Sequence, residues 1–309
     1  MISREDIELA VQRIDGYVRQ TPMMVLESGI WGIDARIVLK LEQLQHAGSF
    51  KPRGAFNRIL SNGIPDGGII AASGGNHGVA VAYAAQTLGH RAEIFVPEIS
   101  SPIKIERLRH YGAQVEIVGA NYAEALIASE VRAAETGALT VHAYDQPETV
   151  AGQGTLGREI EEQYPDLDTI LVAVGGGGLI GGIAAWYRRE VNVIGVEPER
   201  APTLYTALTA GKPVDVEVGG IAADSLGARR IGSLAFDVAT HFIETTLLVS
   251  DEAIRNAQRK LWEDLRIVVE PGGATALAAL LSKQYRPQRG ERVGIVLCGA
   301  NVNLEHLVF

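Results

Sequence analysis

The chain has 309 residues, of which 47% are hydrophobic and 21% are charged, as in folded globular proteins rather than disordered ones. Its net charge of −9 argues against a broad basic surface for nucleic acid, and no apolar run reaches the length of a membrane span. The one cysteine excludes a disulfide framework and a multi-cysteine metal site, and the acidic N-terminus is unlike a signal peptide. We therefore expect a cytoplasmic protein without a nucleic-acid or membrane partner.

Short apolar runs alternate with helical patterns along most of the chain. A capping-box pattern at Ser3 predicts a first helix, residues 35–41 are typical of a strand, and Pro52 is well placed to begin a second helix. Further strands are predicted at residues 68–72, 92–96, 114–118, 139–142, 168–174, 191–196, 242–249 and 292–297. Further helices are predicted at residues 78–88, 103–111, 122–135, 149–162, 179–189, 251–265 and 274–281.

Alternating strands and helices indicate crossover connections and mostly parallel sheets, so the fold class predicted is α/β. The strands are too many for one simple sheet, and we therefore predict two α/β lobes. No linker or repeat marks a boundary between them. We assign residues 1–60 and 147–309 to a large domain and residues 61–146 to a small α/β domain inserted into it.

Three loops rich in small residues directly follow predicted strands, at residues 73–78, 175–178 and 298–301. In open α/β sheets, ligands bind outside the carboxyl ends of the strands, so these loops predict a binding site. Four consecutive glycines at 175–178 let backbone N–H groups converge on an anion, and the next helix adds its positive end. Phosphate is the ligand we expect, and a tight packing turn is the alternative.

The same glycine run also fits a different phosphate ligand. Gly176, Gly178 and Gly181 have the spacing of a dinucleotide fingerprint, and Glu197 ends the next strand, where an acid could bind a ribose. On this motif alone, an NAD(P)-binding oxidoreductase is as good an interpretation as any other phosphate-binding enzyme.

Lys51 lies between Phe50 and Pro52 at a predicted helix start. A semi-apolar, positive environment there would disfavour the ammonium form and lower the lysine pKa. Lysines with a lowered pKa form Schiff bases, although a solvated surface lysine is the alternative for this residue taken alone. A lysine of this kind beside a phosphate loop, without a metal cluster, indicates pyridoxal phosphate.

Four motifs occur in order with wide separations. They are Ser-Phe-Lys-Pro-Arg-Gly-Ala from residue 49, Ser-Gly-Gly-Asn-His-Gly from 73, Gly-Gly-Gly-Gly-Leu from 175 and Cys-Gly-Ala-Asn-Val-Asn from 298. Together they resemble the fold-type II pyridoxal-phosphate enzymes, close to the threonine/serine dehydratase (ammonia-lyase) and serine racemase branch. The resemblance, which runs from about residue 21 to residue 303, implies a tryptophan synthase β-like fold with the cofactor between the two lobes.

The resemblance implies cofactor contacts position by position. Lys51 resembles the lysine that binds the cofactor covalently and later removes the substrate α-proton, and Phe50 resembles the residue packed beside the ring. Asn76 resembles the asparagine that hydrogen-bonds the ring hydroxyl, and Cys298 the residue that faces the pyridine nitrogen. The implied phosphate loop consists of Gly175, Gly176, Gly177 and Gly178. The loop implied to hold the substrate carboxylate contains Ser73, Gly74, Asn76 and His77, of which Ser73 is also a candidate catalytic residue.

Departures from the family pattern refine the expected activity. A neutral thiol at Cys298 favours loss of a β-leaving group over transamination. Gly74 stands where serine racemases have a second serine, which favours a dehydratase. Thr203 stands where metal-activated relatives have an acid, so Glu197 is only a possible metal ligand. Ser225 replaces a common glycine, which puts the exact hydroxy-amino acid in doubt.

We therefore predict an ammonia-lyase that converts L-threonine, L-serine or a related hydroxy-amino acid to a 2-oxo acid and ammonia. A serine racemase and a β-replacement enzyme are the alternatives within pyridoxal-phosphate chemistry. An NAD(P)-binding oxidoreductase and a ligand-binding protein without catalysis are more remote alternatives. The resemblance also implies a homodimer or homotetramer.

Overall fold

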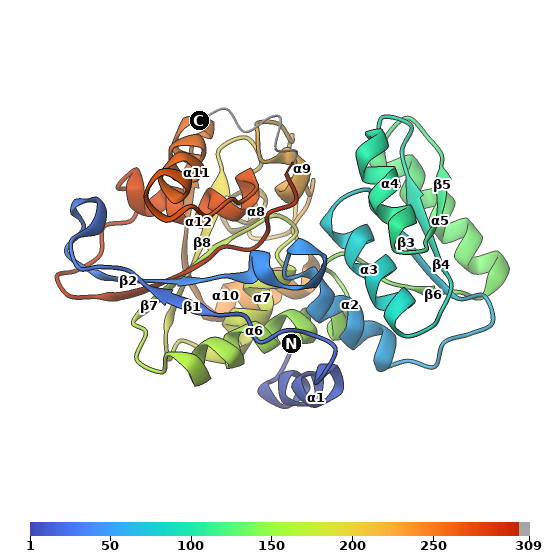
Figure 1. The fold of residues 1–309 in the computed structure, drawn as a ribbon, viewed down its shortest axis with the longest axis horizontal. Coiled ribbons are helices and arrows are strands. Elements are labelled where there is room, and N and C mark those ends of the chain that lie inside the picture. The colour runs from blue at the N-terminus through green and yellow to red at the C-terminus, as the bar shows by residue number, and fades with distance from the viewer. Residues whose placement is uncertain (303–309) are drawn as a thin grey trace.

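The computed structural model describes residues 1–302, so the end of the fourth motif, Asn303, lies outside the described residues. Figure 1 shows two lobes side by side, each built on its own sheet. The sheet of the larger lobe contains, in order across it, β1 (Met23–Val25), β2 (Arg36–Lys40), β10 (Arg292–Val296), β7 (Thr169–Ala173), β8 (Asn192–Pro198) and β9 (Ile243–Val249). The sheet of the smaller lobe contains, in the same way, β5 (Gln114–Ile117), β4 (Ala92–Val96), β3 (Ile69–Ala72) and β6 (Leu139–Thr140). Among the described strands, neighbours are parallel except β1 with β2.

Helices cover both sheets, as parallel strands require. The smaller sheet is accompanied by α3 (Asn76–Thr87), α4 (Pro102–His110) and α5 (Tyr122–Thr136). The remaining helices are α1 (Arg4–Ile14), α2 (Lys51–Leu60), α6 (Pro147–Gln163), α7 (Gly178–Tyr187), α8 (Thr203–Ala210), α9 (Ala223–Leu226), α10 (Ser233–Phe242), α11 (Asp251–Leu265) and α12 (Pro271–Leu281). Three short 3-10 turns are η1 (Ile30–Gly32), η2 (Glu42–Leu44) and η3 (His46–Gly48). No helix within residues 1–302 has the length and apolar character that a membrane crossing requires.

The predicted α/β class with mostly parallel sheets is confirmed, and the predicted strands fall on observed ones. The capping box at Ser3 is also present, because the Ser3 hydroxyl accepts from the Asp6 N–H while the Asp6 carboxylate accepts from the Ser3 N–H. The main omissions are β1, α8 and α10. Helix α8 has no side-chain cap of its own, so its sequence carries no local start signal.

Helix α2 packs against both α6 of the larger lobe and α3 of the smaller lobe. Its Phe56 and Ile59 belong to the same core cluster as Ile69 and Ile94 of the smaller sheet. Residues 61–146 contain all four strands of the smaller sheet, but this core extends across the proposed cut at residue 60. The domain boundaries therefore remain a prediction.

Candidate active site

The carboxyl ends of β7 and β10 and the start of α3 meet at one cavity between the lobes. Its empty volume is about 470 Å³, part of it open to solvent. The predicted residues that line it are Phe50, Lys51, Asn76, Gly175, Gly176, Gly177, Gly178 and Cys298. Ser225, which the sequence singled out as a departure from the family pattern, also lines it. Residues that sequence reasoning did not place in the site line it as well, and these include Tyr144 and Glu270. Sequence elements more than 200 residues apart are thus brought to one cavity.

Lys51 is the first residue of α2, with Pro52 directly after it where a missing N–H costs nothing. The Lys51 amine donates to the Ala143 carbonyl at 2.7 Å and lies 5.1 Å from the centre of the Phe50 ring. Burial of this amine lowers the pKa of Lys51 to about 8. The lowered pKa agrees with the prediction, but its expected cause is corrected. The Glu270 carboxylate acts to raise the lysine pKa, so burial rather than a positive environment produces the shift.

A buried network of charges supports the first turn of α2. The Arg53 guanidinium donates two hydrogen bonds to Glu42, at 2.8 and 2.7 Å, and approaches Glu159 of α6 at 2.8 Å. The Lys40 amine of β2 also pairs with Glu159, at 2.5 Å. Arg53 and Glu42 are almost completely buried, so neither side chain can move without leaving its partner's charge uncompensated. This network fixes the backbone two residues from Lys51.

The glycine loop between β7 and α7 is packed so closely that side chains would not fit at several of its positions. Gly177 has a φ of +88°, which favours glycine, and a Cβ on Gly176 would lie 2.2 Å from the ring of Tyr144. Within the described residues, the N–H groups of Gly176 and Gly177 donate to no protein acceptor. Adjacent unpaired N–H groups at the start of α7 are suited to a phosphate, so the loop fits one. The packing turn considered as an alternative is also present, because Tyr144 closes over the same glycines.

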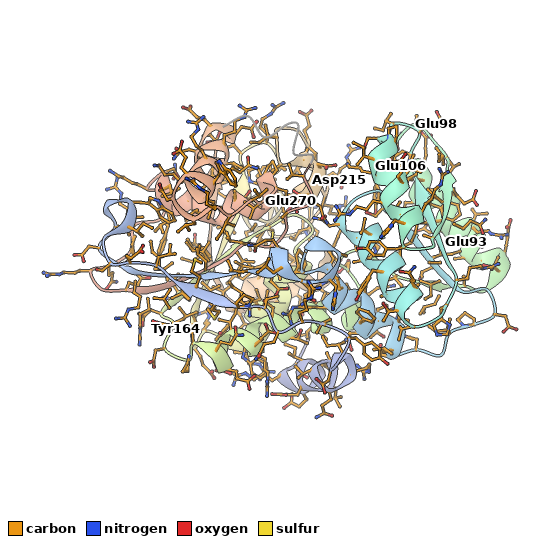
Figure 2. The ribbon with its side chains drawn as sticks, in the orientation of Figure 1. Glu93, Glu98, Glu106, Tyr164, Asp215 and Glu270 are labelled. Atoms are coloured by element: carbon orange, nitrogen blue, oxygen red, sulfur yellow. The ribbon has the colours of Figure 1, made fainter. Side chains whose placement is uncertain are left out.

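Asn76 belongs to a chain of hydrogen bonds at the edge of the cavity. Its Nδ2 donates to Glu270 Oε1 at 2.6 Å, and its Oδ1 accepts from Asn301 Nδ2 at 2.6 Å. Glu270 is buried near the centre of the molecule (Figure 2), and this burial raises its pKa to about 7. Burial also raises the pKa of the Cys298 thiol, so this side chain stays neutral. The cavity of Lys51 therefore also contains a carboxyl group that can gain or lose a proton near neutral pH, Glu270, and a neutral thiol, Cys298.

Of the loop predicted to hold a substrate carboxylate, Asn76 lines this cavity. Gly74 and Gly75 line a neighbouring cavity, whereas Ser73 and His77 line neither of the two. The Ser73 hydroxyl accepts from the Gly75 N–H at 3.2 Å. Burial lowers the pKa of His77 to about 3, so the neutral ring donates its Nε2–H to the Val141 carbonyl at 2.8 Å. In this structure His77 therefore braces the loop.

Glu197 does not have the surroundings of a ribose-binding or solvated acid. Its carboxylate is buried and accepts from the N–H groups of Leu204 and Tyr205, at 2.8 and 2.7 Å, at the start of α8. Thr203 Oγ1 lies 3.1 Å from the same carboxylate and donates to the Gly175 carbonyl at 2.6 Å. Glu197 thus caps α8 and links that helix to the glycine loop. No group of three His, Cys, Asp or Glu side chains suited to a metal occurs within residues 1–302.

The comparisons with known proteins agree with this geometry. A family model described as pyridoxal-phosphate dependent enzyme matches residues 14–299. The chain belongs to this family. The predicted family and the predicted cofactor are thereby confirmed, and the buried Glu197 removes the support for the nicotinamide alternative. The cavity also fits pyridoxal phosphate. The Lys51 amine lines the same space as the glycine loop, whose N–H groups are unpaired and whose residues have no side chains to block a phosphate.

Several relatives of this pyridoxal-phosphate enzyme have curated names. The L-threonine ammonia-lyase of Thermotoga maritima is 37% identical, over 98% of this chain and 77% of its own length. The biosynthetic L-threonine dehydratase of Salmonella typhimurium is 38% identical, and this chain spans 57% of it. Among solved structures, maize serine racemase has a TM-score of 0.93, 33% identity and coverage of 99% and 95% of the two chains. The threonine deaminase of Solanum lycopersicum, isoform 2, has a TM-score of 0.91, 29% identity and coverage of 98% and 90%.

Proposed function

We propose that this enzyme is an ammonia-lyase that converts L-threonine or L-serine to the 2-oxo acid and ammonia. The observation that carries the proposal is the Lys51 amine, whose pKa is about 8, in the same cavity as the phosphate-suited glycine loop. An amine that loses its proton near neutral pH can act as a nucleophile and as a base. Relatives named L-threonine ammonia-lyase at 37% and 38% identity support the choice of reaction.

The residues of the cavity have separate tasks in this proposal. Bound pyridoxal phosphate supplies an electron-withdrawing ring that makes the substrate Cα–H acidic. The glycine loop and the N-terminus of α7 bind the phosphate group through backbone N–H groups, and Asn76 orients the ring through its carboxamide. Gly74 and Asn76, which line the adjoining cavity, provide backbone N–H groups for the substrate carboxylate, and the Ser73 hydroxyl orients this loop through its bond to the Gly75 N–H. Lys51 would then accept the α-proton, and the β-hydroxyl would leave as water after taking a proton from a water molecule. Hydrolysis of the released enamine would add water and give the 2-oxo acid and ammonia.

Cys298 sets the choice between elimination and other reactions in this proposal. Because burial raises the pKa of its thiol, Cys298 presents an uncharged group to the ring. A neutral partner does not hold the pyridine nitrogen protonated, as a carboxylate would, and so favours rapid loss of the β-substituent. A carboxylate close to the ring nitrogen would weaken this preference for elimination. The nearby Glu270 carboxyl group is instead hydrogen-bonded to Asn76.

The test is a visible spectrum of the purified enzyme together with an assay of 2-oxo acid. We expect an imine absorption band that borohydride bleaches, and 2-oxo acid from L-threonine or L-serine. Lys51→Ala should abolish both signals, whereas Lys212→Ala, at an exposed lysine, should leave both unchanged. A band without 2-oxo acid from L-threonine, L-serine or 3-hydroxyaspartate would refute the ammonia-lyase, and the absence of a band after addition of the cofactor would refute the role of Lys51.

Racemisation is the second candidate function. It requires, in addition to Lys51, a proton donor on the opposite face of the substrate. Gly74 has no side chain for this role, but Ser100 Oγ lies only 3.2 Å from where a Cβ on Gly74 would be. The Ser100 hydroxyl could therefore serve in place of a second serine. Formation of D-serine from L-serine that is lost in Ser100→Ala would establish this activity, and its absence in the wild type would exclude it.

We also propose a cytoplasmic location, a homodimer or homotetramer, and domains comprising residues 1–60 with 147–309 and residues 61–146. The single buried cysteine supports a reducing compartment. The family resemblance supports the oligomer, and sedimentation velocity of the purified protein tests it, since a monomer would contradict the proposal. Limited proteolysis tests the boundaries, with cleavage expected near residues 60 and 146.

A further inference from the structure

A second cavity adjoins the first on the side of the smaller lobe. The two cavities share Asn76 and Glu270, and the second has an empty volume of about 320 Å³. Its other lining residues are Gly74, Gly75, Val79, Lys104, Arg107, Asp224 and Asn301. The space is thus bounded by the loop proposed to hold the substrate carboxylate and by α4, which faces α9 across the gap between the lobes (Figure 1).

Two cations project from α4 into this space, three residues apart and so on the same face of the helix. Lys104 already has a partner, because its amine forms an ion pair with Asp224 of α9. Arg107 is different. It is half-buried, and its guanidinium makes no hydrogen bond or ion pair with another residue of the described chain. A partly buried guanidinium without an acceptor is a site prepared for an anion.

The other walls of the second cavity offer little apolar surface to a substrate side chain. Val79 is the one apolar side chain among the described residues that line it, and the rest are glycine, amide or charged residues. Two carboxyl groups line this cavity with Arg107. Asp224 already pairs with Lys104, and Glu270, whose pKa Arg107 acts to lower, is bonded to Asn76. The cavity therefore favours a substrate that brings its own negative group.

We infer that Arg107 is a specificity-determining residue that binds a second carboxylate, on the side chain of the substrate. This inference rests on the proposed function and narrows its substrate class to β-hydroxy-α-amino acids that carry a side-chain carboxylate. With 3-hydroxyaspartate, the Cα–H and Cβ–O bonds break and water leaves. Hydrolysis then adds water back and releases ammonia, so the net products are oxaloacetate and ammonia. No additional reactant is required.

The first experiment compares kcat/KM for 3-hydroxyaspartate and L-threonine in three holoenzymes: the wild type, Arg107→Ala and Arg109→Ala. Arg109 is the matched control, because it lies on the same helix but is exposed and lines neither cavity. We expect Arg107→Ala to lower kcat/KM for 3-hydroxyaspartate about 10- to 100-fold, the range for a lost charge-assisted hydrogen bond, mainly through KM. L-Threonine should be affected less than threefold, and Arg109→Ala should change neither value. An equal fall for both substrates, or no fall for either, would overturn the inference.

The second experiment measures binding without turnover. L-Aspartate has the second carboxylate but no β-leaving group, and L-2-aminobutyrate is a neutral comparison of similar size. Calorimetric titration of the holoenzyme should show tighter binding of L-aspartate, and Arg107→Ala should remove that difference. Equal affinities in the wild type would refute the anion site. If L-aspartate binding depends on Arg107 while no hydroxy-amino acid yields a 2-oxo acid, the proposed function fails and the anion site stands.

Discussion

The pKa of Lys51 provides the most direct physical test of the site. At pH 7.5 a pKa of about 8 leaves about a quarter of the Lys51 amines neutral, against about 0.1% for an ordinary lysine of pKa 10.5. The reactive form is thus enriched roughly 200-fold by burial of the amine. Glu270→Gln removes a carboxylate that acts to raise this pKa, so the midpoint in that variant should fall below about 8.

Labelling of the apoenzyme measures this midpoint directly. Brief exposure to a small amine-reactive reagent between pH 6 and pH 11, followed by peptide mass spectrometry, gives the fraction of Lys51 modified at each pH. N-acetyl-lysine treated in parallel controls for the pH dependence of the reagent itself. A labelling midpoint near 8 for Lys51, and a lower one in Glu270→Gln, is the expected result. A wild-type midpoint above 10 would refute the argument that burial governs the protonation of this amine.

Two further predictions concern the support of the site. Gly176→Ala should weaken cofactor binding at least tenfold by fluorescence titration, because its Cβ would overlap the Tyr144 ring, whereas Gly63→Ala has open space and should bind normally. Retained affinity in Gly176→Ala would show that the loop can shift. Arg53→Met should lower the free energy of unfolding in urea by about 3–5 kcal/mol, because it leaves buried carboxylates unpaired. Arg230→Met, which breaks an exposed pair, should cost no more than about 1 kcal/mol, and similar losses in the two variants would contradict the role of burial.

The sequence predicted most of the residues that line the main cavity, because their signals are local. Lys51 is followed by a proline at a helix start, and the loops of small residues come directly after apolar strands. Consecutive glycines at 175–178 have a conformational meaning that does not depend on the rest of the fold. Strand and helix periodicities likewise depend on neighbouring residues, so the α/β class and the parallel sheets could be inferred. The order of four separate motifs then indicated the family.

The tertiary structure alone decided which groups surround these residues. The sequence assigned no site role to Glu270 or Tyr144, because their partners come from elements more than 100 residues away or from the opposite lobe. Arg107 gave no sequence signal either, since an arginine on a short polar helix is ordinarily solvated. Glu197 was placed on the correct strand, but its capping of α8 required the chain to return beside it. Desolvation and ion pairing depend on distances in space, and these distances are set only when the two lobes pack together.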